Sequence, residues 1–474
     1  MPLQTLTEQL WKQLRSGNAE QVDIAITRAE VQGYDLSPFD IEYAELCSYI
    51  ESPTGGTPFS AIAIVYSCSK VDLSGRELSV LPESLRQLRN LNILIINDNE
   101  LTFLPDWIGE KNQLKELQVR GNLLESLPSS IGKLELLETL DLSYNRLSKL
   151  PVTLFQLQRL HKLNLQANKL TTLPDQLGML LSLKKLSLGE NPMNSLPDAI
   201  GDLQNLQELG LNSMGLSSLP DGICRIQQLN MLNLQRNLLT ELPADFGKMT
   251  GLKELYLTQN RLASLPDTFG RLQKLSRLSL EHNNLSQLPD SFCNLIALSE
   301  LQLQDNHLTA LPENFGNLEN LSELYLERNK LEKLPESIIS LVYLKDLWAQ
   351  SNLISELPEN LGNMIALEYL NLENNPIDSI PKSVISLLKL KNLLLANTKL
   401  ISLPAGVSQM KLDELDFSGT PWEEEMEKVQ PGQTTDDEAD IEASSGKKDN
   451  GGCFAAMLFF IITASAAVYL MFLG

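Results

Sequence analysis

The chain has 474 residues, of which 38 are Lys or Arg and 60 are Asp or Glu, so its formal net charge is −22. This acidic balance argues against a nucleic-acid partner, because phosphate backbones bind clusters of positive charge. Length alone would allow about three domains. The five cysteines show no disulfide framework, which favours a reducing compartment.

Residues 1–67 contain no repeat, and their apolar spacing predicts helices at Thr7–Leu14, Glu20–Val31 and Asp40–Ile50. A basic segment followed by a long apolar core is absent, so we expect no secretory signal peptide. We predict that this region is a helical N-terminal cap, because the end of a stacked array exposes its core unless it is covered. A partner-binding helical module is the alternative.

A repeat of 23 residues occupies residues 68–422. Proline follows an aliphatic residue at fifteen positions with an unbroken spacing of 23: Pro82, Pro105, Pro128, Pro151, Pro174, Pro197, Pro220, Pro243, Pro266, Pro289, Pro312, Pro335, Pro358, Pro381 and Pro404. A fixed period of this length indicates a solenoid of stacked units. We count sixteen units, of which the first and the last are irregular.

The unit Leu252–Lys274 shows why this spacing predicts a solenoid. Leu255 and Leu257 alternate along a short strand and face inward, and strands of successive units are expected to form one parallel sheet. Asn260 follows the strand, where its amide offers a donor and an acceptor to backbone groups of the turn and of the neighbouring unit. Proline then starts the return segment, and Phe269 faces the core. Twelve units keep the asparagine: Asn99, Asn122, Asn145, Asn168, Asn191, Asn237, Asn260, Asn283, Asn306, Asn329, Asn352 and Asn375.

The composition changes after residue 422. Residues 423–452 are acidic and poor in apolar side chains, which predicts a disordered linker after a brief helical start. Residues 453–474 carry no charge and are long enough to cross a hydrocarbon layer of roughly 30 Å as one helix. Lys447 and Lys448 precede this segment and favour the cytoplasm for the repeat domain. We therefore expect a single-pass tail anchor; a GPI signal is the alternative, and it would require secretion.

The unit LxxLxLxxNxLxxLPxxIGxL, present in Leu114–Leu134 and Leu183–Leu203, resembles the 23-residue intracellular leucine-rich repeats of the Ras-suppressor, Scribble and plant Ras-group families. The resemblance covers residues 68–422. It implies an α/β solenoid, a leucine-rich-repeat horseshoe with a parallel concave sheet. The helical N-terminal cap and the one C-terminal transmembrane helix lie outside the resemblance and are predicted from the residues themselves. These families imply signalling scaffolds that bind proteins, small GTPases among them. We expect a monomeric solenoid.

Motifs of catalysis do not accompany the repeats. The three histidines are His161, His282 and His307, and no carboxylate or thiol spacing completes a metal site around them. The sequence contains no P-loop, nucleophile elbow or kinase motif. We expect no catalytic residue, no metal and no cofactor, and hence no enzyme.

The candidate partner site lies on the outward residues of the later strands. The residue between the two strand leucines is small or polar in most units but aromatic in others, and arginines occupy nearby outward positions. The aromatic candidates at this position are Tyr256, Tyr325 and Trp348, with Tyr369 two positions earlier in its own unit, and the arginines are Arg236, Arg261, Arg277 and Arg328. Tyr, Trp and Arg on a rigid surface are the residue types that dominate binding hot spots. The arginines predict a local basic feature suited to an acidic patch on the partner.

Together these features predict a membrane-tethered, cytoplasm-facing interaction scaffold in signal transduction. It would bind a protein partner on the concave face, a small GTPase or another signalling protein, and no nucleic acid. An extracellular or cell-surface recognition protein is the alternative.

Overall fold

The computed structural model of the chain describes residues 8–14, 19–32 and 68–428. The chain divides into two compact units, Met1–Leu209 and Gly210–Gly474, and each is described by itself. The predicted helix at Asp40–Ile50, most of the predicted linker and the predicted anchor at 453–474 lie outside the described residues. Within the described residues, no helix is both long and apolar enough to span a membrane.

Two helices of the N-terminal region are described, α1 (Glu8–Leu14) and α2 (Ala19–Gln32), and they pack on each other. They agree within one residue at each end with the helices predicted from apolar spacing. Leu10, Ala25 and Ala29 are buried. The prediction that residues 1–67 cap the first repeat stays a prediction.

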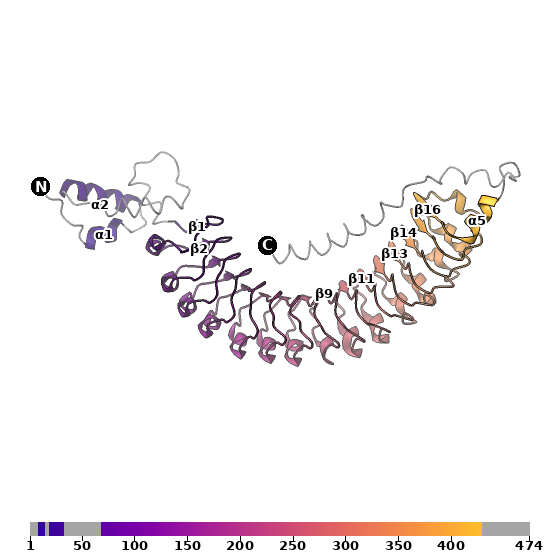
Figure 1. The fold of residues 1–474 in the computed structure, drawn as a ribbon, viewed down its shortest axis with the longest axis horizontal. Helices are drawn as coiled ribbons and strands as arrows, with labels where there is room; N and C mark the ends of the chain where they lie inside the picture. The colour runs from indigo at the N-terminus through magenta and orange to yellow at the C-terminus, as the bar shows by residue number, and fades with distance from the viewer. Residues whose placement is uncertain (1–7, 15–18, 33–67, 429–474) are drawn as a thin grey trace. The chain divides into compact units, whose positions relative to one another are not determined.

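Each predicted repeat contributes one strand of three residues, and we number the repeats by their strands (Figure 1). Sixteen strands occur in the described residues, in agreement with the sixteen units counted in the sequence. They are β1 (Lys70–Asp72), β2 (Ile93–Ile95), β3 (Glu116–Gln118), β4 (Thr139–Asp141), β5 (Lys162–Asn164), β6 (Lys185–Ser187), β7 (Glu208–Gly210), β8 (Met231–Asn233), β9 (Glu254–Tyr256), β10 (Arg277–Ser279), β11 (Glu300–Gln302), β12 (Glu323–Tyr325), β13 (Asp346–Trp348), β14 (Tyr369–Asn371), β15 (Asn392–Leu394) and β16 (Glu414–Asp416).

In each of the two compact units, the strands of successive repeats pair in parallel in the order of the chain. Paired residues are 23 positions apart, which is the period of the sequence repeat. Leu278 lies opposite Leu255 on one side and Leu301 on the other. The last strand is the exception, because Leu393 pairs with Leu415, one residue short of the period. This matches the shortened sixteenth unit seen in the sequence.

The return segment of each of the first fifteen repeats forms a short 3₁₀ helix, and in most of them proline is the residue before it. These helices are η1 (Glu83–Gln87), η2 (Asp106–Glu110), η3 (Ser129–Lys133), η4 (Val152–Gln156), η5 (Asp175–Met179), η6 (Asp198–Asp202), η7 (Asp221–Arg225), η8 (Phe246–Lys248), η9 (Asp267–Arg271), η10 (Asp290–Asn294), η11 (Phe315–Asn317), η12 (Glu336–Ser340), η13 (Leu361–Asn363), η14 (Lys382–Ser386) and η15 (Val407–Gln409). Proline suits this position because its φ is already restricted near −65° and no backbone donor is lost from the helix.

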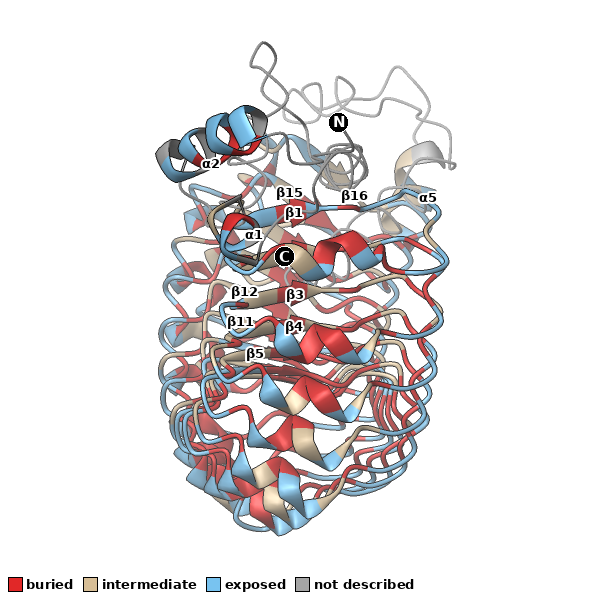
Figure 2. Ribbon diagram, turned by 90° about the vertical axis from the view of Figure 1, so that its left-hand side faces the viewer, coloured by how far each residue is buried: buried red, intermediate tan, exposed pale blue. Residues whose placement is uncertain are grey.

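The core lies between the strands and these helices, and Figure 2 shows buried residues recurring along both. Leu255, Leu257 and Phe269 are fully buried, as predicted. Phe246 and Phe269 stack with their ring centroids 6.0 Å apart, and Phe269 and Phe292 stack at 6.1 Å. At Gly270 a Cβ atom would lie 1.9 Å from the carbonyl oxygen of Ser291, so the close approach of neighbouring 3₁₀ helices requires glycine there.

The asparagine ladder links twelve of the repeats to the repeat before each of them. Asn260 Oδ1 accepts the backbone N–H of Leu239 at 3.1 Å, and its Nδ2 donates to the carbonyls of Leu234 and Leu257, both at 2.9 Å. All twelve predicted asparagines are buried. Met214 takes the place of the asparagine in repeat 7 and is 2% exposed. At the position equivalent to Leu239, Met193 donates its N–H to the carbonyl of Asn191 at 2.8 Å.

A buried lysine replaces a core leucine of the pattern in repeat 2. Lys111 is 2% exposed, and its Nζ donates to the carbonyl oxygens of Leu85, Arg86 and Leu88 at 2.6, 2.9 and 2.9 Å. Burial lowers the pKa of Lys111 to about 8. The side chain therefore satisfies carbonyls at the end of η1 that a leucine would leave to other donors.

The last repeat ends in the helix α5 (Pro421–Lys428). Thr420 Oγ1 accepts the N–H of Glu423 at 3.2 Å, and the Glu423 carboxylate accepts the N–H of Gly419 at 2.6 Å. The rings of Phe417 and Trp422 lie 4.6 Å apart. This reciprocal capping starts the helix where the sequence predicted a brief helical segment, and the aromatic pair ties it to the final strand.

Asn260→Ala should lower the free energy of unfolding by about 1–3 kcal/mol, because it leaves a buried backbone donor and buried carbonyls without partners. Asn284→Ala is the matched control, since Asn284 is exposed beside the ladder residue Asn283. Thermal or denaturant unfolding of both variants gives the comparison. Equal losses in the two variants would contradict the ladder as a source of stability.

Candidate functional site

The surface formed by the outward residues of the strands is called here the sheet face. Each repeat contributes the first and third residues of its strand and the second residue after it; in repeat 9 these are Glu254, Tyr256 and Thr258. Parallel strands lie roughly 4.8 Å apart, so equivalent residues of neighbouring repeats form columns of touching side chains. The chemistry of the sheet face is therefore set by residues 23 positions apart in the sequence.

Three aromatic side chains stack across β12, β13 and β14. The rings of Tyr325 and Trp348 are 6.1 Å apart at an interplanar angle of 21°, and those of Trp348 and Tyr369 are 4.2 Å apart at 24°. All three are half-buried. We call these three residues the aromatic cluster. The structure thus brings together three of the four aromatic candidates taken from the sequence.

The fourth aromatic candidate, Tyr256, is not available on the surface. It lies in the same column as Tyr325 but is only 2% exposed. Its hydroxyl donates to Glu254 Oε2 at 2.7 Å, and Arg277 also hydrogen-bonds to it. Burial, together with the bond to Glu254, raises the pKa of the Tyr256 hydroxyl. The expectation of an exposed side chain fails here because charged side chains of its own strand and of the next one enclose the ring.

The four arginines lie on exposed positions, but three of them bind polar groups of the same surface. Arg277 Nε donates to Glu300 at 2.6 Å, and Arg328 Nη1 lies 3.5 Å from Asp305. Arg236 Nε donates to Gln259 at 3.1 Å, and Arg261 is exposed. Because carboxylates offset Arg277 and Arg328, these arginines do not make the sheet face basic.

A column of glutamate and glutamine lies beside the aromatic cluster, at the second position after the strand. In four consecutive repeats one buried oxygen of this side chain has no hydrogen-bond partner among the residues that the structure describes: Glu281 Oε2, Gln304 Oε1, Glu327 Oε2 and Gln350 Oε1. We call these four residues the acceptor column. This column is not among the site residues predicted from the sequence, although Glu and Gln alternate there every 23 residues.

Burial changes the acidity of both carboxyl groups in the acceptor column. It raises the pKa of Glu281 to about 7, with Glu300 and Asp305 adding to the shift and the Thr258 hydroxyl, which donates to Glu281 Oε1 at 2.6 Å, opposing it. Burial also raises the pKa of Glu327 to about 7. Ionisation of these two carboxyl groups near neutral pH therefore lowers the stability of the folded chain.

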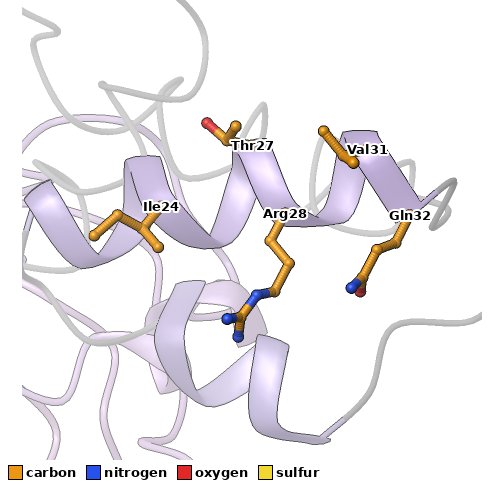
Figure 3. A pocket seen from close by; sticks show the side chains of 5 residues that line it. All are labelled: Ile24, Thr27, Arg28, Val31 and Gln32. Carbon is orange, nitrogen blue, oxygen red and sulfur yellow. The ribbon is translucent and has the colours of Figure 1, made fainter.

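Two shallow hollows lie away from the sheet face. One is lined by five residues on the exposed side of α2, shown in Figure 3: Ile24, Thr27, Arg28, Val31 and Gln32. The other lies along the Leu-Pro segments of repeats 7 to 9 and includes Asp221, Glu241 and Pro266. Across residues 8–14, 19–32 and 68–428, no group of three His, Cys, Asp or Glu side chains could hold a metal ion.

Glu327→Gln should stabilise the protein at pH 8 by about 1–3 kcal/mol, with a gain that shrinks toward pH 5. The sign follows from the raised pKa: Glu327 contributes stability below pH 4.5, its ordinary value, and that contribution is lost as the pH rises through about 7. Unfolding midpoints measured from pH 5 to 8 test this. The exposed Glu332→Gln makes the same charge change and should leave the profile unaltered; a Glu327→Gln gain independent of pH would contradict the assignment.

Comparison with protein families finds matches along the repeats. A leucine-rich repeat region matches residues 108–191 and 175–260, a leucine rich repeat matches residues 251–308, and a further one matches residues 366–387. The comparison with curated proteins finds no match.

Solved structures extend the likeness to most of the chain. A leucine-rich repeat protein of Leptospira interrogans is 32% identical, with 76% of this chain and 93% of that one covered and a TM-score of 0.61. The ectodomain of the plant membrane receptor kinase GASSHO1/SCHENGEN3 from Arabidopsis thaliana, in complex with Casparian Strip Integrity Factor 2, is 30% identical over 76% of this chain and 48% of that one, with a TM-score of 0.58.

The Toll–Spatzle complex of Drosophila is 25% identical over 74% of this chain and 50% of the other, with a TM-score of 0.65. Leucine-rich repeat proteins are typically binding scaffolds without enzymatic activity. The near-complete coverage of the Leptospira protein and the sixteen parallel repeats lead to one conclusion: the chain belongs to the leucine-rich repeat family.

Proposed function

We propose that the chain is a protein-recognition scaffold whose partner binds the sheet face of repeats 9 to 14, centred on the aromatic cluster. The observation that carries this proposal is the stacking of Tyr325, Trp348 and Tyr369 on one rigid surface. Aromatic side chains lose little conformational entropy on binding and bury a large apolar area, which is why they dominate hot spots.

The surrounding framework supports a preformed site. The ladder residues Asn329, Asn352 and Asn375 hold the turns after β12, β13 and β14 in place. A partner would therefore meet a surface that needs little ordering, which lowers the cost of association.

Two of the solved relatives are complexes with another molecule, which supports a protein or peptide as the partner. The Arabidopsis ectodomain is bound to Casparian Strip Integrity Factor 2, and the Drosophila relative is the Toll–Spatzle complex. The narrower expectation of a small GTPase rests on the sequence resemblance alone.

The relatives favour the extracellular or cell-surface setting over the cytoplasmic one, because the Arabidopsis relative is a receptor ectodomain. The cytoplasm-facing, tail-anchored setting is supported by the uncharged segment 453–474, by Lys447 and Lys448 before it, and by the free thiols of Cys224 and Cys293. Recognition through the sheet face is proposed in either setting.

Replacing Tyr325 and Trp348 together by alanine should abolish partner capture. Each hot-spot truncation costs about 2 kcal/mol or more, so the pair should weaken binding by at least about 100-fold. Proximity labelling with the full chain in its native membrane or compartment measures the loss, and thermal unfolding checks the fold.

Tyr343→Ala is the matched control. Tyr343 is 62% exposed, belongs to the same repeat as Tyr325 and is not one of the sheet-face residues. Its labelled partners should be those of the unaltered chain. Full capture by the double variant, with the fold intact, would refute the proposed site.

Deleting residues 453–474 should move the protein from the membrane to the soluble fraction with its unfolding midpoint unchanged, if this segment is the anchor. Digestion of the full chain by protease added to the cytosolic side of sealed membranes then reports the location of the repeats. Persistent membrane association of the truncated protein would overturn the anchor, and protection from the protease would exclude the cytoplasm-facing setting.

A further inference from the structure

The acceptor column carries an inference that rests on the proposed function and specifies the chemistry of the partner. We propose that the partner segment is basic, and that two of its arginine or lysine side chains donate hydrogen bonds to Glu281 and Glu327 while its backbone passes beside the aromatic cluster.

The first support is the set of unsatisfied acceptors. Glu327 and Gln350 are 7% and 8% exposed, and each has one buried oxygen without a partner, as do Glu281 and Gln304. Buried polar atoms are nearly always hydrogen-bonded in folded proteins, because an unmet acceptor costs about 1–3 kcal/mol. Four such oxygens recur at one position of four consecutive repeats, and no donor among the described residues meets them.

The second support is charge. The carboxylates of Glu300, Asp305, Glu323 and Asp346 lie on or beside the strands that bear the acceptor column. Two nearby cations are engaged with them, because Arg277 binds Glu300 and Arg328 lies against Asp305. A negative field of this kind attracts a basic segment, so the acidic partner patch expected from the arginines alone is replaced by a basic one.

The third support is spacing. Backbone bonds continue from repeat to repeat at this column, from Gln259 N–H to the Glu281 carbonyl and from Asp305 N–H to the Glu327 carbonyl, both at 3.0 Å. Glu281 and Glu327 are two repeats apart, which corresponds to roughly 9.5 Å at the usual distance between strands. An extended strand places same-side residues roughly 6.8 Å apart, and that matches neither one repeat nor two.

A polyproline II segment does match. It has three residues per turn and rises about 3.1 Å per residue, so side chains three positions apart lie on one side at roughly 9.3 Å. Segments of this type also bind surfaces lined with aromatic rings, which the aromatic cluster supplies next to the column. The geometry points to a proline-rich partner segment in which two cationic residues are separated by two other residues.

The test uses a fluorescent, amidated peptide with two arginines three positions apart in a proline frame, titrated against the full chain in detergent. Binding should be saturable and should weaken with added salt. The double variant Glu281→Gln with Glu327→Gln should lower the affinity at least tenfold at pH 8 without lowering the unfolding midpoint. The control is the double variant Glu116→Gln with Glu208→Gln, on the sheet face of the compact unit Met1–Leu209. It makes the same charge change and should bind the peptide like the unaltered chain.

Two control peptides refine the result: glutamates in place of the arginines should abolish binding, and arginines in adjacent positions should weaken it. Absence of binding by the unaltered chain, or equal binding by both double variants, would overturn the inference. Either result leaves the aromatic cluster to be judged by its own alanine variants, because those report partner capture and not the charge of the partner.

Discussion

The buried asparagine amide that follows twelve of the sixteen strands is the interaction on which the rest of the structure depends. It satisfies backbone groups of its own turn and of the preceding repeat at once, as Asn260 does with Leu257 and Leu234. Each of these groups would cost about 1–3 kcal/mol if it were left unpaired in a core of leucine side chains. In repeat 7, where Met214 replaces the asparagine, the Met193 N–H bonds to the carbonyl of Asn191 instead. The asparagine bonds therefore fix both the turn and the register in which repeats stack.

A fixed register has a direct chemical consequence for the sheet face. Residues 23 positions apart must lie side by side, whatever their charge or size. This brings Tyr325, Trp348 and Tyr369 into a stack, and it equally forces Glu281 and Glu327 into a crowded column where burial raises both pKa values to about 7. Stacked rings and crowded carboxyls are thus two results of one packing rule.

The residues that stabilise the repeats and the residues of the sheet face are different sets. Leucines and ladder asparagines are set by stability and are shared by most repeats, whereas the outward positions are free to differ, which is why the proposed recognition is placed on them. The acceptor column has oxygens without donors among the described residues, and the aromatic cluster beside it is only half-buried. The interactions of this surface are therefore incomplete in the chain alone. That incompleteness is the physical basis for assigning a partner to it.

Sequence by itself determined the period, the sixteen units, the inward leucines, the ladder and the start of the return segments at proline, because each follows from local spacing that one repeat contains in full. It also placed the aromatic cluster, since the strand register follows from that period. Only the tertiary structure decided that Tyr256 is buried, that Arg277 is matched by Glu300, and that four acceptors in one column lack donors. These properties depend on side chains of neighbouring repeats and on the conformations they adopt, which no pattern within a single repeat can specify.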